Sequence, residues 1–565
     1  MTYSRYWINS YPPGVPADID AGQIRSVAQL AEESFTRYAD RVAFIQMGRS
    51  ITFRELDAQT RAFGAWLQHH AGLKRGGRVA IMMPNLLQYP IALFGVLRAG
   101  GTVVNTNPLY TARELEHQLK DSGAETVVIL ENFAHVLQEV IGRTQVKHVV
   151  VTSVGEMLGF PKGPIVDFVV RRVRKQVPTW DLPGHHRFLD VLAAGARHAL
   201  THVDLDHDDL AFLQYTGGTT GVSKGAMLSH GNIAANTLQS TAWTEPAWPK
   251  DQAGIAITAL PLYHIFALTG NCILFLRIGW TNVLITNPRD FPGFVKELKK
   301  RRFTFISGVN TLFNALLHTP GFEQVDFGAL RCTLGGGMAV QRAVAERWKQ
   351  VTGCILTQAW GLTETSPAAC INPITEDFND SIGLPISSTE IGIADDDGNM
   401  LPIGQSGEIC VRGPQVMKGY WNRPEETAKV MLPDGWLRTG DIGRMDERGF
   451  VYIEDRKKDM INVSGFNVYP NEVEGVAVTH PGVLEAAAVA QPSEHSGEAV
   501  VLFVVRKDPA LTEEALLEHC RASLTGYKMP RHVYFRKELP KTNVGKILRR
   551  ELRDEAAKLA PAPAG

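Results

Sequence analysis

The first third of the chain alternates helix-start signals with short apolar runs. Residues 52–55 (Thr-Phe-Arg-Glu) and 111–114 (Thr-Ala-Arg-Glu) each match a capping box, in which a Thr and a Glu three residues later satisfy free backbone N–H groups at a helix start. Residues 79–83, 126–130 and 146–152 are mainly apolar, and the last two runs are rich in β-branched residues, which is typical of buried strands. Strands that alternate with helices form a largely parallel sheet covered by helices on both faces. This pattern predicts an α/β fold.

The length of the chain and a change of texture near residue 383 predict several structural units. The chain has 565 residues, and one hydrophobic core stops growing at about 250–300 residues. After residue 383, short strand patterns alternate with turn sequences, which favours antiparallel β structure. We predict an N-terminal domain of layered α/β sheets at 1–455, with a β-rich subdomain at about 383–455. A hinge at 456–460 would lead to a small α+β C-terminal domain at 461–565.

Composition narrows the class of protein. The formal net charge is −1, so the chain lacks the excess of Lys and Arg that nucleic-acid binding requires. The six cysteines include no Cys-x-x-Cys pair, which favours small buried side chains in a reducing compartment over a zinc knuckle or a redox pair. The N-terminus shows no apolar segment of a secretory signal. These features predict a cytoplasmic protein that does not bind nucleic acid.

Residues 255–275 are mostly apolar and approach the length of about 20 residues that can cross a bilayer. Pro261, Tyr263, His264 and Asn271 interrupt this stretch with helix-breaking or polar groups. We therefore predict that it is buried core and not a transmembrane helix.

The segment with the clearest chemical meaning is the loop at 215–225, Tyr-Thr-Gly-Gly-Thr-Thr-Gly-Val-Ser-Lys-Gly. Its glycines let the backbone approach a ligand closely, its hydroxyl and N–H groups can donate hydrogen bonds to phosphate oxygens, and Lys224 adds a positive charge. It is not a Walker A loop, because Gly225 follows the lysine where that motif has Ser or Thr. Residues 221–225 also match the Gly-x-Ser-x-Gly elbow of hydrolases, and a structural turn is a third reading. We favour phosphate binding, because it alone explains the whole cluster.

Five further stretches carry the features of a known family: residues 83–90, 261–268, 308–313, 461–470 and 540–550. Together with the loop they resemble the adenylate-forming superfamily of acyl-CoA synthetases, luciferases and peptide-synthetase adenylation domains, and within it the bacterial long-chain-fatty-acid–CoA ligases. The resemblance covers almost the whole chain. It implies activation of a carboxylic acid by ATP to an acyl-adenylate with release of pyrophosphate, followed by transfer to CoA. ATP, Mg²⁺ and CoA are the expected cofactors.

By this resemblance a set of residues would bind ATP and Mg²⁺. Glu364 and the Thr219 hydroxyl would hold Mg²⁺ together with phosphate oxygens. Thr363 would contact the α-phosphate, and Asp441 would accept hydrogen bonds from both ribose hydroxyls. Trp360 stands where most relatives have Tyr; it would stack on adenine, and any role of the missing hydroxyl is open. The other residues assigned to the nucleotide are Thr216, Gly217, Gly218, Thr220, Gly221, Ser223, Lys224, Gly335, Gly336, Gly337 and Arg456.

The resemblance also assigns residues to the two half-reactions. Lys546 matches the family's adenylation lysine, which bridges the α-phosphate and the incoming carboxylate. Lys458 occupies the hinge position and would absorb the change in φ and ψ when a mobile C-terminal domain rotates between the half-reactions. With Thr363 and Glu364, these two lysines form the predicted catalytic set. The channel for CoA would be lined by Ser464, Gly465 and Phe466.

The acyl substrate follows from the resemblance alone, because pocket size cannot be read from a sequence. We expect a long-chain fatty acid. A medium-chain or aryl acid, the loading of a carrier protein, a luciferase and a noncatalytic acyl-binding protein are alternatives, and a homodimer is left open. His264 has the competing reading of a satisfied core histidine. The residues assigned to the acyl pocket are His264, Val309, Phe313 and Met338.

Residues 167–175 (Asp-Phe-Val-Val-Arg-Arg-Val-Arg-Lys) combine basic and apolar side chains. Such a segment can lie on an anionic membrane surface, where a fatty acid partitions. The alternative, which we slightly favour, is an amphipathic helix packed on the core. Peripheral association with the inner face of the cytoplasmic membrane therefore stays open.

Overall fold

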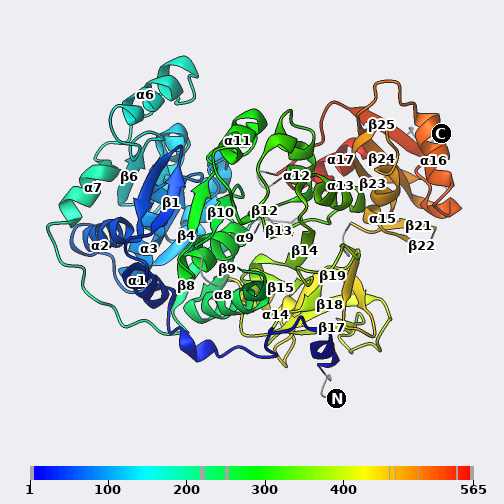
Figure 1. The fold of residues 1–565 in the computed structure, drawn as a ribbon, viewed down its shortest axis with the longest axis horizontal. Coiled ribbons are helices and arrows are strands. Elements are labelled where there is room, and N and C mark those ends of the chain that lie inside the picture. The colour runs from blue at the N-terminus through cyan, green and yellow to red at the C-terminus, as the bar shows by residue number, and fades with distance from the viewer. Residues whose placement is uncertain are drawn as a thin grey trace.

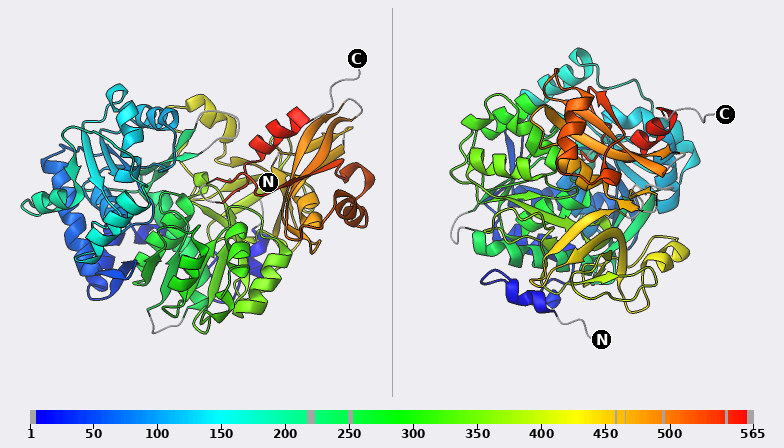
Figure 2. Two further views of the ribbon diagram at one scale, coloured as in Figure 1. Left: turned by 90° about the horizontal axis from the view of Figure 1, so that it is seen from above. Right: turned by 90° about the vertical axis from the view of Figure 1, so that its right-hand side faces the viewer.

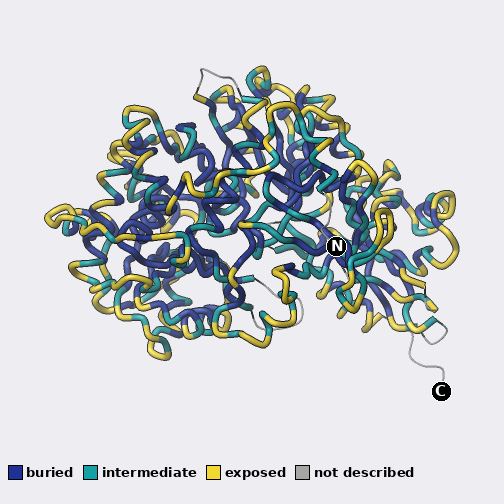
Figure 3. The backbone as a smooth tube through the Cα atoms, turned by 90° about the horizontal axis from the view of Figure 1, so that it is seen from below, coloured by how far each residue is buried: buried dark blue, intermediate teal, exposed yellow. Residues whose placement is uncertain are grey.

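The structure is a computed structural model that describes residues 5–216, 223–248, 253–456, 459–464, 466–493, 496–542 and 545–559. Within these residues the strands form four sheets. Figure 1 shows an elongated molecule in which the C-terminal sheet and its helices stand at one end. In the left panel of Figure 2 this C-terminal part lies opposite the blue and cyan N-terminal helices. Buried backbone runs through the interior of the large N-terminal part, and exposed segments form its periphery (Figure 3).

The first sheet contains the alternating segment and confirms the predicted parallel arrangement. Its strand order is β7-β6-β5-β3-β4-β8-β9, and every neighbouring pair is parallel except β8 with β9. All residues of β5 are buried. The bounds are β3 (Arg78–Met82), β4 (Thr102–Asn105), β5 (Thr126–Leu130), β6 (His148–Thr152), β7 (His186–Arg187), β8 (Leu210–Thr216) and β9 (Lys224–Ser229).

Both predicted capping boxes are present at helix starts. Thr52 begins α2 and Thr111 begins α4, and in each case the Glu three residues later bonds back to the threonine N–H at 2.8 Å. α2 packs against α3 and α7, and the residues of α3 are all buried. The helices of this part are α1 (Val27–Arg37), α2 (Phe53–His69), α3 (Gln88–Arg98), α4 (Ala112–Ser122), α5 (Ala134–Val140), α6 (Lys162–Phe168), α7 (Phe188–Gly195) and α8 (His230–Thr244).

The second sheet has the order β16-β15-β14-β13-β12-β10-β11-β1-β2 and is parallel from β14 to β1. Its strands are β1 (Val42–Gln46), β2 (Arg49–Thr52), β10 (Ile255–Thr258), β11 (Thr281–Leu284), β12 (Phe305–Gly308), β13 (Cys332–Gly335), β14 (Leu356–Gly361), β15 (Ala368–Ile371) and β16 (Leu384–Pro385). Its helices are α9 (Ile265–Ala267), α10 (Leu274–Arg277), α11 (Phe291–Leu298), α12 (Asn310–Leu317) and α13 (Arg342–Thr352).

The apolar stretch at 255–275 is buried, as predicted. It forms β10, two short helices and the π-helical segment Leu268–Ile273, in which every residue except Gly270 is buried. No helix within the described ranges is both long and apolar enough to cross a bilayer. All six cysteines are also buried and carry free thiols.

An antiparallel β-rich subdomain is present, as predicted for the fold, and its sheet begins at Glu390, because Leu384–Pro385 (β16) still belongs to the second sheet. Its sheet has the order β17-β18-β19-β20, and each neighbouring pair is antiparallel. The elements are β17 (Glu390–Ala394), β18 (Gly407–Arg412), β19 (Leu437–Met445), β20 (Val451–Arg456) and α14 (Pro424–Val430).

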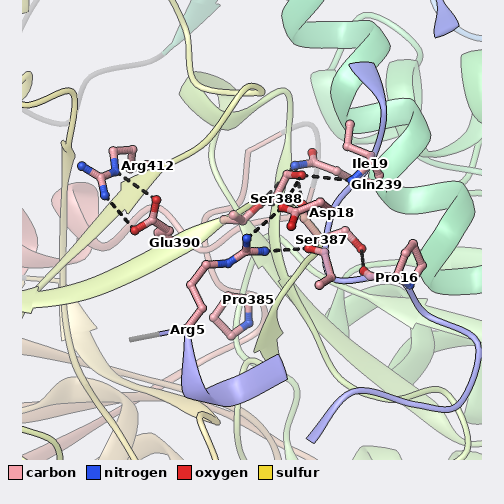
Figure 4. A network of polar contacts seen from close by, with 12 residues as sticks. Arg5, Pro16, Asp18, Ile19, Gln239, Pro385, Ser387, Ser388, Glu390 and Arg412 are labelled. Carbon is pink, nitrogen blue, oxygen red and sulfur yellow. Dashed lines mark hydrogen bonds and ion pairs between the residues drawn. The ribbon is translucent and has the colours of Figure 1, made fainter. Parts of the chain in front are cut away.

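The segment before α1, residues 5–26, forms an N-terminal arm that joins this subdomain to α8 (Figure 4). Asp18 forms an ion pair with Arg5 at 2.8 Å and accepts a hydrogen bond from Ser388 Oγ at 3.0 Å. Ser387 Oγ donates to the Pro16 carbonyl at 2.6 Å, and Gln239 of α8 donates to the Ser387 carbonyl at 2.8 Å. The arm therefore follows a fixed path across the surface of the large domain.

The C-terminal part has its own sheet and its own hydrophobic clusters on both faces of that sheet. Thr311 of α12 donates to the Gly545 carbonyl at 3.2 Å, and Asn314 donates to the Leu484 carbonyl at 3.4 Å, so this part docks on α12. The elements are β21 (Ile461–Val463), β22 (Phe466–Val468), β23 (Val483–Ser493), β24 (Gly497–Arg506), β25 (His532–Arg536), α15 (Pro470–Ala477), α16 (Glu513–Arg521) and α17 (Arg549–Leu559).

Candidate active site

A cavity of about 730 Å³ lies where β8, β9, the second sheet and the β-rich subdomain meet the C-terminal part, which contributes Thr542 and Lys546 from the loop before α17. Its walls come from segments that are far apart in the sequence, because the carboxyl ends of parallel strands gather at one edge of a sheet. Many residues predicted from the sequence line it: Thr216, Lys224, His264, Gly336, Gly337, Trp360, Thr363, Glu364, Asp441 and Lys546.

Other predicted residues lie elsewhere. Phe313 is fully buried, with its ring 4.8 Å from that of Trp348, and Val309 is buried behind Gly337. Gly335 ends β13, and Met338 packs on the core. The Ser223 carbonyl contacts His117 Nε2 at 3.0 Å. The structure does not bring these residues, or Ser464 and Phe466, into the cavity lining.

Several predictions fall outside the described residues. They concern Gly217, Gly218, Thr219, Thr220, Gly221, Lys458 and Gly465. The backbone of Arg456 is described and pairs with Asp441 across β20 and β19. The roles of the residues outside the described ranges, in binding phosphate and CoA and in the hinge, therefore stay predictions.

At the end of the cavity predicted to hold the nucleoside, Trp360 is hydrogen-bonded to Asp441, the carboxylate predicted to bind the ribose. The Trp360 Nε1–H donates to Asp441 Oδ2 at 3.0 Å, and both side chains are buried. An indole N–H is a donor only, so it holds the carboxylate that accepts from it in one orientation. The tryptophan thus has a function that a phenyl ring could not supply.

We expect Trp360→Phe to weaken ATP binding, because the ring is retained and the hydrogen bond to a charged group is lost. Such bonds are worth about 1.5–3 kcal/mol, so the KM for ATP should rise by roughly ten- to a hundredfold. Steady-state kinetics with ATP and 2′-deoxy-ATP measure the effect. Because Asp441 would hold the ribose hydroxyls, the variant should discriminate less between the two nucleotides, and unchanged discrimination would contradict this assignment.

At the phosphate end, a chain of polar contacts joins the loop lysine to the predicted metal ligand. Lys224 Nζ lies 2.9 Å from Glu426 Oε2 and 4.7 Å from the centre of the Tyr420 ring. Tyr420 Oη donates to Glu364 Oε1 at 2.7 Å. Burial raises the pKa of Tyr420, and Glu364 acts in the same direction, so Tyr420 remains a donor at neutral pH.

These residues fit a magnesium ion that is shared with phosphates. A carboxylate oxygen such as that of Glu364 is the kind of ligand that Mg²⁺ prefers. In the described part of the chain no three His, Cys, Asp or Glu side chains gather to form a metal site by themselves. Mg²⁺ at Glu364 would therefore need phosphate oxygens as further ligands, and Lys224, which lines the same cavity, is the predicted partner of the same phosphates.

Between these ends, Lys546 lies against the glycine-rich wall, and His264 lines the same cavity. A Cβ atom added to Gly337 would lie 3.3 Å from Lys546 Cε, so the glycine leaves room for the lysine stem. Gly337 also has a φ of +79°, which favours glycine. Burial lowers the pKa of His264 to about 3, and Lys546 acts in the same direction, so this imidazole is neutral. His264 Nδ1 accepts from the Phe266 N–H at 3.3 Å.

Sequence reasoning missed several residues that line the cavity. Tyr420 gave no signal, because a tyrosine after Lys-Gly has no distinctive spacing. Gln214 precedes the loop and donates to the Tyr263 carbonyl at 2.7 Å while accepting from Asn105 at 2.9 Å. The lining also includes a largely apolar group of residues from α8, the segment after it, α10 and β12, which we call the apolar extension: Ser240, Thr244, Trp248, Leu274, Phe275 and Phe305.

The fold and this cavity define an enzyme class. Residues 31–421 match the family described as AMP-binding enzyme, and residues 472–546 match the AMP-binding enzyme C-terminal domain. The chain belongs to this family of AMP-binding enzymes. It is 57% identical over 553 residues to a long-chain-fatty-acid–CoA ligase of Escherichia coli O6:H1, and 54% identical over 555 residues to one of Haemophilus influenzae, covering 98% of each chain in both cases.

Solved structures of related enzymes share the fold over nearly the full length. An anthranilate CoA ligase, AuaEII, in complex with anthranoyl-AMP superposes with a TM-score of 0.84 at 25% identity, covering 96% of this chain and 99% of that one. ATP-bound MatB from Rhodopseudomonas palustris superposes with a TM-score of 0.81 at 28% identity, covering 94% and 99%.

Proposed function

We propose that this protein is an AMP-forming ligase that converts a long-chain fatty acid, ATP and CoA into fatty acyl-CoA, AMP and pyrophosphate. One observation carries the proposal: a single cavity brings together Lys224, Glu364, Asp441 and Lys546 and continues into an apolar extension. Asp441 suits the ribose, and Lys224 and Glu364 suit the phosphates with their metal ion. Lys546 suits the reacting carboxylate. The extension suits a hydrocarbon chain.

In the first half-reaction these side chains would hold two anions in contact. Asp441 would bind the ribose, Lys224 would bind the outer phosphates, and Lys546 would pair with both the carboxylate and the α-phosphate. The carboxylate oxygen attacks the α-phosphorus and pyrophosphate leaves. Mg²⁺ at Glu364 would neutralise charge on the phosphates. Stabilisation of the developing charge by fixed cations is the main contribution that these residues make.

In the second half-reaction the CoA thiol attacks the acyl carbonyl and AMP leaves. Lys546 occupies the site in the present arrangement, so it must withdraw before the thiol can approach. We propose that residues 456–460 are the hinge between domains at 1–455 and 461–565, with Lys458 absorbing the rotation and Ser464, Gly465 and Phe466 then lining the channel for CoA. Phe466 is exposed, and its ring stacks on that of Tyr527 at 4.9 Å. This exposure supports the proposal, because the side chain is free to contact CoA after the rotation.

The test is to measure AMP and pyrophosphate release, with and without CoA, for acids from acetate to oleate. We expect pyrophosphate release to need a long-chain acid and Mg²⁺, and AMP release at a sustained rate to need CoA as well. If no acid triggers cleavage of ATP, the proposed function is wrong.

We also propose that residues 160–175, which comprise α6 and the short segments on either side of it, contact an anionic membrane surface. This part projects from the body of the large domain in Figure 1. Its apolar side chains Phe160, Ile165, Phe168 and Val173 are exposed, and Phe160 is 92% exposed. The neighbouring residues 171, 172, 174 and 175 are basic and exposed as well. Exposed apolar side chains beside cations suit the boundary between headgroups and acyl chains.

Sedimentation with vesicles that contain anionic lipid tests the membrane contact. We expect Phe160→Ser combined with Phe168→Ser to reduce binding several-fold, because both apolar contacts are removed. Ile403→Ser, a change at another exposed apolar residue, should have no effect. Equal binding by all three proteins, or no binding at low salt, would rule out this surface.

A further inference from the structure

A second cavity of about 1470 Å³ lies beside the apolar extension of the active-site cavity. Its walls come from the N-terminal arm, from α1 and from the end of α8, and they carry charged side chains as well as apolar ones. The charged members of the lining are Glu33, Arg37, Arg41, Glu245 and Arg277. Arg277 is only partly exposed, and this burial lowers the pKa of its guanidinium.

The end of α8 separates the two cavities. Ser240 and Thr244 are one turn apart and line the active-site cavity, whereas Thr241 and Ala242 line the second cavity. This division follows from the helical period, because residues four apart share a face. The backbone of α8 therefore forms a fixed part of the partition. Trp248, which follows the helix, lines both cavities and continues the partition as a side chain.

Aromatic contacts hold Trp248 in place. Its ring centre lies 4.7 Å from that of Trp280, 6.2 Å from that of Phe305 and 6.3 Å from that of Phe275, all in edge-to-face arrangements. The Trp248 Nε1–H is buried and has no hydrogen-bond partner among the described residues. The side chain is therefore positioned by packing alone, and one substitution can remove it without breaking a polar network.

We propose that Trp248 is the end wall of the acyl tunnel and sets the upper limit of acyl chain length. This inference rests on the proposed function and adds a specificity-determining residue to it. A fatty acid whose carboxylate lies at Lys546 would run past Gly336 and Phe266, and its methyl end would meet Trp248. Beyond that ring the second cavity offers space, so the chain length is limited by a side chain and not by the backbone of the fold.

Trp248→Ala should join the two cavities. We expect the ratio of kcat/KM for arachidate to that for laurate to rise by about tenfold, because hydrophobic pockets discriminate by this order per missing or extra contact. A ratio is used because a general loss of activity cancels in it. The control is Tyr38→Leu, which removes another aromatic side chain from the lining of the second cavity. The Tyr38 ring packs on Phe53 and is not one of the rings around Trp248, so the ratio should stay unchanged.

A matched pair on α8 tests the same wall from the tunnel side. Thr241 and Thr244 are both buried, and each donates its hydroxyl to the backbone carbonyl four residues earlier at 2.7 Å. Leucine at either position loses the same bond and adds the same volume. Thr244→Leu should shorten the tunnel and lower the arachidate-to-laurate ratio, whereas Thr241→Leu should not change it.

The proposal is overturned if Trp248→Ala or Thr244→Leu activates laurate with an unchanged ratio, or if Thr241→Leu changes the ratio as much as Thr244→Leu does. If Trp248→Ala does not fold, the α8 pair decides the question. These outcomes differ from failure of the proposed function, in which the unchanged protein would release no pyrophosphate with either acid.

Discussion

Lys546→Ala should lower acyl-adenylate formation by about 10²–10³-fold, the loss found when one preorganised charge-stabilising group is removed from an active site. Lys546 lies in the cavity against the glycine-rich wall, where it would meet both the carboxylate and the α-phosphate. Thioester formation from supplied acyl-adenylate should be largely retained, because in the proposed mechanism Lys546 withdraws before that step. ATP–pyrophosphate exchange and CoA-dependent AMP release report the two steps separately.

Lys541 provides the control. It belongs to the same loop but forms an ion pair with Glu485 at 2.5 Å and does not line the cavity. Lys541→Ala should keep most of the exchange activity. Equal loss of both half-reactions in Lys546→Ala would refute the division of labour, because it would indicate a general disturbance of the C-terminal domain.

Glu364→Gln is expected to have the second-largest effect. The amide keeps the shape of the side chain and can still accept from the Tyr420 hydroxyl, but it removes the negative charge that a magnesium ion requires. Exchange activity should fall by roughly 10²-fold, and the remaining activity should need a higher Mg²⁺ concentration. A titration of activity against Mg²⁺ measures both effects.

Glu426→Gln is the matched control, since Glu426 contacts Lys224 at the other end of the same chain of polar groups. The hydrogen bond from Lys224 holds the pKa of Glu426 below its usual value, so this carboxylate is ionised at neutral pH. ATP phosphates would replace Glu426 as the partner of this lysine. Its removal should therefore leave the Mg²⁺ dependence unchanged, and a shift as large as that of Glu364→Gln would contradict the assignment of the metal ligand.

The parts of the fold that could be predicted are those encoded by neighbouring residues. The capping boxes at Thr52 and Thr111 act within four residues, and the predicted strand at 126–130 coincides with β5. The spacing and type of a few neighbouring residues are sufficient to predict such an element, because these same residues make the contacts that stabilise it. The sheet order could not be predicted, because it depends on which apolar faces pack together.

Site residues that belong to a family motif could be predicted from the sequence. Contacts between residues that are far apart in the sequence could not. Trp360 was known to depart from its relatives, but its bond to Asp441 links residues 81 positions apart and exists only after β14 and β19 meet. Tyr420 and Glu364 are separated by 56 positions. Conversely, Phe313 lies in a family motif and is predicted to line the acyl pocket, but its ring packs against Trp348. The motif could not predict this, because it does not show which face of α12 is buried.

The burial of every native thiol has a practical consequence for testing the proposed domain rotation. Cys272, Cys332, Cys354, Cys370, Cys410 and Cys520 are all shielded from solvent. A single cysteine engineered on the surface of each domain should therefore react with maleimide dyes without any prior removal of native ones. Energy transfer between two such dyes would follow the angle between the domains during turnover, in a protein whose own sequence is otherwise unaltered.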